Sequence, residues 1–197
     1  MTNTLICVIG PSGSGKSTLV RKFIEKFNDK YSCNTLVSDT TREIRPKEIP
    51  GESYNFMTED KFSSRNHIES ITYNGKRYGL SVEELNSKRN SAEITFFVCD
   101  IEGYILLKNM FQGKNIYGVF IKMSSSQCIQ NMRIRKSINK DIDNKIKDRV
   151  FYDCSIDAYN LDSKFNFDAI VHYRNSYSYF EQQFFDVVKS IYENDRM

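Results

Sequence analysis

A glycine-rich segment near the N-terminus has the residue types that bind phosphate. Residues 10–17 are GPSGSGKS and match the pattern G-x-x-x-x-G-K-[ST] in full. The glycines let backbone N–H groups converge on phosphate oxygens, while Lys16 reaches the β- and γ-phosphates and Ser17 can bind Mg²⁺. The sequence therefore predicts a P-loop that binds ATP with Mg²⁺. The expected ATP contacts are Gly10, Pro11, Ser12, Gly13, Ser14, Gly15, Lys16, Ser17 and Thr18.

The residues around this loop predict the elements that hold it in place. Residues 5–9 (LICVI) form a continuous apolar run, typical of a strand buried on both faces of a parallel sheet. Residues 16–27 place apolar side chains at helical spacing. Further apolar runs at 94–99, 116–121 and 167–171 each precede a segment that can be helical. This alternation predicts an α/β fold in which helices cover both faces of a parallel sheet.

Two segments interrupt the alternation. Residues 39–92 hold two of the three prolines and three glycines, and the Asn74–Gly75 pair is a hairpin signal. We expect this segment, called the lobe below, to be a small insert of antiparallel strands. Residues 123–156, called the lid, are polar, contain neither glycine nor proline, and are expected to be helical. The expected domains are a core of 1–38, 93–122 and 157–197, the lobe at 39–92 and the lid at 123–156.

A P-loop alone does not identify what accepts the phosphoryl group. Two broad classes fit: a GTPase-like switch, in which water attacks, and a small-molecule kinase, in which a second substrate attacks. In a kinase, the lobe is where the second substrate would have to lie.

The lobe contains a long motif of arginines, tyrosines and acids. Together with the P-loop, it makes residues 4–103 resemble the guanylate kinases, which typically show S-x-T-T-R-x-x-R-x-x-E-x-x-G-x-x-Y-x-F, then an I-E pair, then Y-G. The matching residues here are Ser38, Thr41, Arg42, Arg45, Glu48, Gly51, Tyr54, Phe56, Ile68, Glu69, Tyr78 and Gly79. The resemblance implies a P-loop NTPase core with a monophosphate-binding lobe and a helical lid. It also implies transfer of the γ-phosphoryl group of ATP to GMP or dGMP.

The chemistry of the lobe residues agrees with this resemblance. Arg42 and Arg45, three residues apart, can present guanidinium groups to one phosphate, and the hydroxyls of Tyr54 and Tyr78 can complete the cradle. Guanine presents N1–H and N2–H₂ side by side, a pair that a carboxylate accepts, whereas its O6 needs a donor. The resemblance assigns the first role to Glu69 and the second to Ser38.

Asp100, at the end of the apolar run 94–99, has two possible roles. General P-loop logic makes it the acid that holds Mg²⁺ through water. In the family pattern D-x-D-x-Q-G, aligned on Gly103, it is the second aspartate and would contact guanine. Val98 then stands at the first aspartate and Glu102 at the glutamine. Both roles of Asp100 stay open at this point.

The lid is the most basic part of the chain. Between residues 122 and 149 there are eight basic and three acidic residues, which leaves +5. The resemblance implies arginines here that close on the transferred phosphoryl group, and the candidates are Arg133, Arg135 and Arg149. The expected catalytic residues are thus Lys16, Arg42, Arg133, Arg135 and Arg149.

Composition limits the class of protein. A chain of 197 residues with 40% hydrophobic residues can bury a substantial core. A net charge of +3 gives no reason to expect nucleic acid or membrane partners. Five scattered cysteines without a C-x-x-C pair suit reduced thiols, and we expect a cytoplasmic monomer or homodimer. No apolar run approaches the ~20 residues that span a bilayer.

Three alternatives to a GMP kinase remain. One is a kinase of the same family for another (deoxy)nucleotide or a ribose bisphosphate, which the residues Ser38, Tyr54, Glu69 and Tyr78 argue against. Another is a non-catalytic guanylate-kinase-like binding module, although such modules generally degrade the P-loop. The last is a regulatory NTPase switch, which has no use for the lobe.

Overall fold

A parallel five-stranded sheet forms the centre of the molecule. The structure, a computed structural model, describes residues 3–45, 48–73, 75–134 and 140–196. The strand order is β2 (Cys33–Thr35), β7 (Ile94–Val98), β1 (Thr4–Ile9), β8 (Ile116–Lys122) and β9 (Ala169–His172). Every neighbouring pair is parallel. The apolar runs predicted as strands are therefore strands of one sheet, and β1 lies at its middle.

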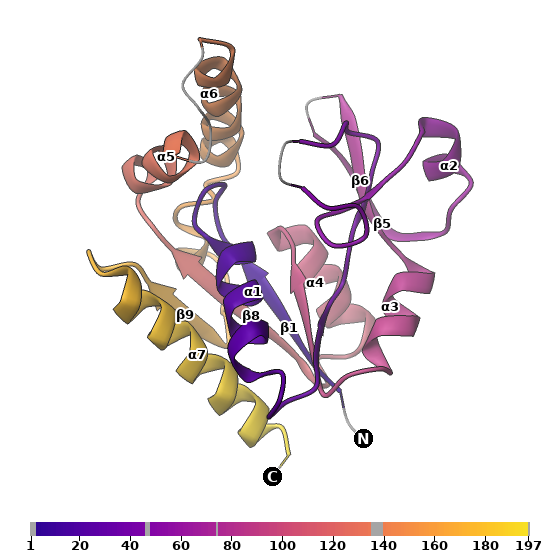
Figure 1. Cartoon of the computed structure of the whole chain (residues 1–197), viewed down its shortest axis with the longest axis vertical. Coiled ribbons are helices and arrows are strands. Elements are labelled where there is room, and N and C mark those ends of the chain that lie inside the picture. The colour runs from indigo at the N-terminus through magenta and orange to yellow at the C-terminus, as the bar shows by residue number, and fades with distance from the viewer. Residues whose placement is uncertain (1–2, 46–47, 74, 135–139, 197) are drawn as a thin grey trace.

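Helices cover both faces of this sheet, which confirms the predicted α/β class (Figure 1). One face packs against α1 (Lys16–Phe27) and α7 (Tyr177–Asn194), and the other against α3 (Val82–Arg89) and α4 (Ile101–Met110). Side chains of β1 alternate between the two faces, with Ile6 and Val8 in the first cluster and Cys7 in the second. A strand that faces two cores needs apolar residues at every position.

The lobe is built around a second, smaller sheet. Its order is β4 (Asn55–Phe56), β3 (Asp39–Thr40), β6 (Lys76–Ser81) and β5 (His67–Tyr73), with the short helix α2 (Glu59–Ser63) beside it. The strands β5 and β6 form the predicted antiparallel hairpin, although Asn74 of its turn lies outside the described residues.

The expectation of a wholly antiparallel lobe is corrected in one respect. Strand β4 pairs parallel with β3, so the small sheet is mixed. The connection between these strands is long enough to return the chain to the starting end, which a parallel pair requires. The carboxylate of Asp39, which is fully buried, joins the strands by accepting hydrogen bonds from Asn55 (3.0 Å) and Arg65 (2.8 Å) and contacting His67 Nε2 (2.9 Å).

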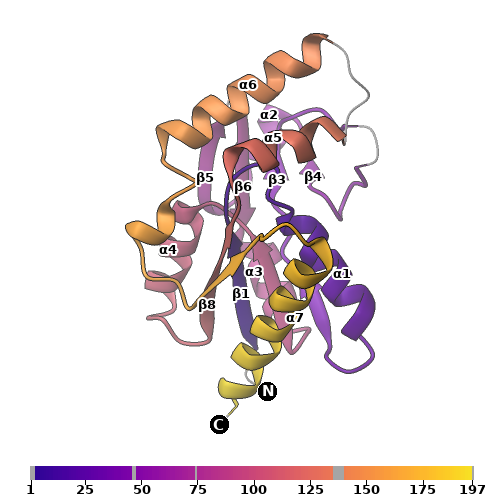
Figure 2. The ribbon, with the colours of Figure 1, turned by 90° about the vertical axis from the view of Figure 1, so that its left-hand side faces the viewer.

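Two helices form the described part of the lid, which confirms the helical lid that the sequence predicts. These are α5 (Ser125–Ile134) and α6 (Lys140–Ser155), and a 3₁₀ turn, η1 (Leu161–Ser163), follows. Both lid helices lie above the carboxyl ends of the central strands, across from the lobe (Figures 1 and 2). The P-loop that follows β1 is therefore bordered by both inserts. In the part of the chain that the structure describes, no helix is long and apolar enough to cross a membrane.

Candidate active site

The P-loop runs from the end of β1 to the start of α1, as its motif requires. Gly13 has a φ of 83°, and a Cβ atom added there would lie 2.5 Å from the carbonyl oxygen of Cys128 in α5. The side-chain amide of Asn131, one turn further along α5, donates to the Gly13 carbonyl (2.9 Å). Only glycine fits this position, because α5 presses directly on the loop.

Lys16, the first residue of α1, folds back over the loop. Its Nζ donates to the carbonyl oxygens of Gly10 (2.6 Å) and Pro11 (2.9 Å). Burial lowers the pKa of Lys16 to about 8, although the nearby carboxylate of Asp153 opposes that shift. The hydroxyl of Ser14 is buried and has no hydrogen-bond partner among the described residues. A buried unpaired hydroxyl and a lysine held by carbonyls suit a loop that binds an anion.

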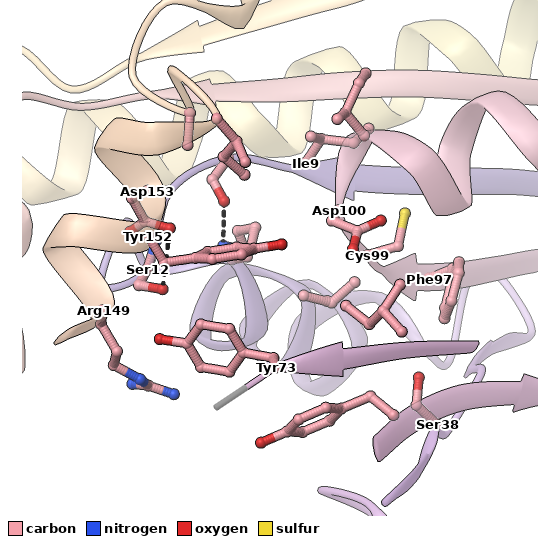
Figure 3. Close-up of a pocket in the computed structure, with 18 of the residues that line it drawn as sticks. Ile9, Ser12, Ser38, Tyr73, Phe97, Cys99, Asp100, Arg149, Tyr152 and Asp153 are labelled. Carbon is pink, nitrogen blue, oxygen red and sulfur yellow. Dashed lines mark hydrogen bonds between the residues drawn. The ribbon is translucent and has the colours of Figure 1, made fainter. Parts of the chain in front are cut away.

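One cavity of about 220 Å³ joins the P-loop, the lobe and the lid. Figure 3 shows Arg149, Tyr73 and Tyr152 gathered on its left side, and Asp100 with Cys99 on its right. The structure thus brings together residues from the predicted phosphate, acceptor and lid sites. The predicted residues that line the cavity are Gly10, Ser12, Lys16, Ser38, Arg42, Arg45, Tyr54, Glu69, Tyr78, Asp100 and Arg149.

Three arginines make one part of this cavity cationic. Arg42 is only 9% exposed and forms a two-pronged ion pair with Glu48, with N···O distances of 2.8 and 2.9 Å. Its burial tends to lower its pKa, but the hydrogen bonds and charge of Glu48 outweigh that effect and raise it. Burial and the neighbouring charges of Arg149 and Arg42 lower the pKa of Arg45. Such a cluster of cationic groups is suited to a dianion.

Two tyrosines complete this cationic part. The rings of Tyr54 and Tyr78 lie edge to face with their centroids 5.8 Å apart, and both residues line the cavity. The guanidinium of Arg42 lies over the Tyr54 ring, 5.0 Å from its centroid. Both hydroxyls therefore belong to the same small region as the guanidinium groups.

The far part of the cavity is acidic. Burial, together with the charges of Asp100 and Glu102, raises the pKa of Glu69 to about 7. Asp100 caps α4, and its Oδ1 accepts the backbone N–H of Gly103 (2.8 Å). A Cβ added at Gly103 would lie 3.4 Å from that Oδ1 and 3.7 Å from the Glu69 carboxyl carbon. Both carboxylates therefore lie close to the start of α4.

Helix α6 contributes residues that the sequence motifs do not predict. The rings of Tyr152 and Tyr73 meet edge to face at 4.6 Å, which joins the lid to the lobe across the cavity (Figure 3). The carboxylate of Asp153 accepts the Ser12 backbone N–H (2.9 Å). Tyr73 and Tyr152 are 79 positions apart in the chain, and no sequence pattern links them. Asp153 follows Arg149 by four residues, so their shared helix face is the one available signal.

Not every predicted residue lines the cavity. Arg133 lies exposed in the last turn of α5 and is not among the lining residues. Arg135 lies outside the described residues. Ser17 is exposed and Thr18 follows it in the first turn of α1, and neither residue lines the cavity. The remaining predicted ATP contacts belong to the loop without lining the cavity: Pro11, Gly13, Ser14 and Gly15.

The donor groups fit a magnesium ion that arrives with a nucleotide. Among the described residues, no three His, Cys, Asp or Glu side chains are grouped so that they could hold a metal ion. Mg²⁺ typically uses one or two protein ligands and completes its shell with substrate phosphates and water. Ser17 has an exposed hydroxyl, and Asp100 has a carboxylate whose Oδ1 accepts the Gly103 N–H; both are oxygen ligands of the kind that Mg²⁺ uses. The apolar Val98 at the end of β7 offers no ligand.

Comparison with known proteins identifies the family. A family model described as guanylate kinase matches residues 2–176. The chain belongs to the guanylate kinase family. The resemblance seen over residues 4–103 is therefore confirmed, and the match continues well into the second half of the chain.

Individual relatives are moderately similar. The guanylate kinase of Chlamydia felis is 32% identical over 117 residues, 57% of this chain and 56% of that protein. The guanylate kinase of Chlamydia muridarum is 30% identical over 145 residues, 72% of this chain and 68% of that protein. The match to the first of these thus spans little more than half of its length. The crystal structure of guanylate kinase from Anaplasma phagocytophilum covers 99% of this chain with a TM-score of 0.61 and 20% identity, which shows the shared fold. That chain is itself 86% covered.

Proposed function

We propose that this chain transfers the γ-phosphoryl group of ATP to GMP or dGMP, giving ADP and GDP or dGDP. One observation carries the proposal: a single cavity is lined by the P-loop, by three arginines and by the two residues assigned to guanine. A switch that uses water needs no second site of this kind. Family membership and the intact P-loop support the same proposal.

The acceptor nucleotide would lie along the length of the cavity. Its phosphate would lie among Arg42, Arg45 and the two tyrosine hydroxyls, where the cationic groups offset its charge. Its base would lie at the acidic part, with Glu69 accepting N1–H and N2–H₂ of guanine and Ser38 facing O6. Adenine offers neither donor, so it would leave the buried carboxylate unpaired.

The chain's residues would then act by positioning and by neutralising charge. An oxygen of the acceptor phosphate attacks the terminal phosphorus of ATP, the bond to the β-phosphate oxygen breaks, and ADP leaves. This oxygen is already anionic near neutral pH, so no general base is required. Lys16 and Arg149 both line the cavity, and the charge of Arg149 contributes to the lowered pKa of Lys16. Their charges would stabilise the equatorial oxygens in transfer.

Magnesium fits this proposal as a companion of ATP. When bound, the ion would neutralise charge on the phosphate oxygens, with Ser17 and Asp100 as the protein groups available to hold it. The predicted acceptor residues and the P-loop line one cavity, so a bound acceptor would lie close to the phosphoryl group, which favours transfer to the acceptor over transfer to water.

A coupled assay of ADP release tests the proposal. The purified chain would be given ATP and Mg²⁺ with GMP, dGMP, AMP, CMP, UMP or a ribose bisphosphate in turn. We expect GMP and dGMP to accelerate ADP release far above the rate without acceptor. Lys16→Met serves as the variant without transfer. If neither GMP nor dGMP accelerates ADP release, the chain is not the kinase proposed here. If another acceptor accelerates ADP release, that compound is the substrate instead.

A further inference from the structure

A carboxylate already occupies part of the P-loop. Asp153, from α6, is 5% exposed, and its Oδ2 accepts the backbone N–H of Ser12 at 2.9 Å. The Ser12 hydroxyl lies 3.4 Å from the other oxygen, Oδ1. The two oxygens thus contact one residue of the loop, in the way that two oxygens of a phosphate would (Figure 3). Backbone N–H groups of a P-loop are the groups that phosphate oxygens use.

The Ser12 amide belongs to the part of the loop that faces the acceptor. Of the P-loop residues 10–17, only Gly10, Ser12 and Lys16 line the cavity shared with Arg42 and Arg45. The phosphate that is transferred must be the one nearest the acceptor. Ser12 is therefore placed toward the terminal phosphate of a bound triphosphate, and the residues closer to α1 are left for the inner phosphates.

The charges of two cations, Lys16 and Arg149, also act on the Asp153 carboxylate. Burial raises its pKa, while the Ser12 hydrogen bonds and the charges of Lys16 and Arg149 act in the opposite direction. Those two cations are the ones that the proposed transfer needs for the terminal phosphate. The carboxylate and that phosphate therefore share both the amide donor and the positive charges, and two anions do not share such a place without strong repulsion.

We propose that Asp153 is a specificity-determining residue for the donor nucleotide, whose carboxylate competes with the terminal phosphate of ATP for the Ser12 amide. ATP must displace Asp153 from Ser12, whereas ADP, which lacks the terminal phosphate, need not. The inference rests on the proposed use of the P-loop for ATP. Its consequence is that the chain holds ATP less tightly, relative to ADP, than the same loop would without Asp153.

Nucleotide binding, measured by calorimetry on the full chain without acceptor, tests this. The probes are the β,γ-imido analogue of ATP and ADP, each with Mg²⁺. Asp153→Ala removes the competing group, and Asp153→Asn removes its charge while keeping an oxygen that can accept from Ser12. Asp148→Ala is the matched control, because Asp148 is an exposed acid of the same helix. Circular dichroism and thermal melting show whether each variant folds.

The proposal expects a difference between the two nucleotides. Asp153→Ala should tighten binding of the ATP analogue by about tenfold or more, as the release of one charge-assisted hydrogen bond and a repulsion implies. ADP binding should change by less than about threefold. Asp153→Asn should change the ratio of the two dissociation constants, ATP analogue to ADP, in the same direction but by less. Asp148→Ala should leave this ratio unchanged.

Three results would overturn the inference: equal tightening for both nucleotides, no tightening in a folded Asp153→Asn chain, or weaker binding of the ATP analogue. The last would make Asp153 a group that holds the triphosphate. Failure of the proposed function looks different. A chain that shows the expected Asp153 pattern but no acceleration by GMP or dGMP keeps this inference and loses its acceptor assignment. A wild-type chain that binds neither nucleotide loses both.

Discussion

The two ends of the cavity differ in charge and in how the protein builds them. At one end lie Arg42, Arg45 and Arg149; burial and the charges of the other two lower the pKa of Arg45, whereas Glu48 pairs with Arg42. At the other end, Glu69 and Asp100 gather carboxylates, and the pKa of Glu69 is raised to about 7. The charges of Arg45 and Glu69 are disfavoured at their respective ends, and a ligand group of opposite character would stabilise each of them. The pair of ends thus suits a molecule with an anionic head and a hydrogen-bond-donating base.

Removing a cation from the phosphate end should have the largest effect. Arg149→Ala is expected to lower kcat by about 10³-fold, because under the proposed function its guanidinium would neutralise charge on the phosphoryl group during transfer. Steady-state kinetics with GMP as the varied substrate would measure it. Arg21→Ala, on an exposed arginine of α1, is the control and should behave as wild type. A loss confined to KM would place Arg149 in acceptor binding alone.

Changing the acidic end should have the next largest effect and act on selectivity. Glu69→Gln is expected to lower kcat/KM for GMP by about 10²-fold or more, since an amide N–H₂ then faces the guanine donors. ATP binding, followed by calorimetry, should change little. Glu52→Gln removes an exposed acid of the lobe and is the matched control. Equal losses for ATP and GMP would contradict the base-recognition role.

The raised pKa of Glu69 predicts opposite pH responses for binding and for stability. GMP needs the ionised carboxylate, so KM should fall about tenfold between pH 6 and pH 8. Stability should move the other way. Between the usual pKa of 4.5 and about 7, the folded chain binds more protons than the unfolded chain, so stability falls as pH rises.

Kinetics and thermal melting across this pH range would test both responses. Glu69→Gln cannot titrate, so the variant should lose both trends, while the titration of the acceptor phosphate remains in both chains. The variant's melting temperature should therefore gain on wild type as pH rises from 5 to 8. If KM and melting temperature depend on pH in the same way in both chains, Glu69 is not the group that causes these trends.

The contact between lobe and lid should give the smallest effect. A double-mutant cycle of Tyr73→Leu and Tyr152→Leu, measured by urea unfolding, is expected to show a coupling of about 0.5–1.5 kcal/mol. The core pair Tyr31 and Tyr192, with ring centroids 5.1 Å apart, is a control expected to couple similarly. Only the first pair should change KM for GMP. If both pairs leave KM alone, the lobe–lid contact has no part in acceptor binding.

The sequence predicts the sheet where strands are long and buried on both faces. Residues 4–9 of β1 are apolar at nearly every position because they contact two cores. The edge strand β2 was not foreseen, since it has three half-buried residues and no apolar run. The parallel pairing of β3 with β4 was missed for a related reason. Two-residue strands show no periodicity, and their direction depends on the path of the connecting chain.

The candidate site also has a part that the sequence predicts and a part that it does not. The lobe residues form a motif because Arg42, Arg45 and Tyr54 lie within thirteen residues of one another on adjacent segments. The spacing of these residues in the sequence is therefore enough to predict that they belong to one site. Asp153 and Tyr152 reach the cavity only through the packing of α6 against the loop and the lobe. No spacing rule links residues 12 and 153, so their contact required the structure.

The close fit of Gly13 beneath α5 has a mechanical consequence. The Cys128 carbonyl leaves no room for a Cβ at Gly13, and Asn131 is hydrogen-bonded to the same residue. A rotation of α5 toward the loop would be blocked by this contact, and a rotation away would break the hydrogen bond. We therefore expect α5 to behave as a fixed mount of the P-loop. Helix α6 is hydrogen-bonded to the same loop through Asp153 and Ser12, so a swing of α6 would have to break that bond while α5 stays in place.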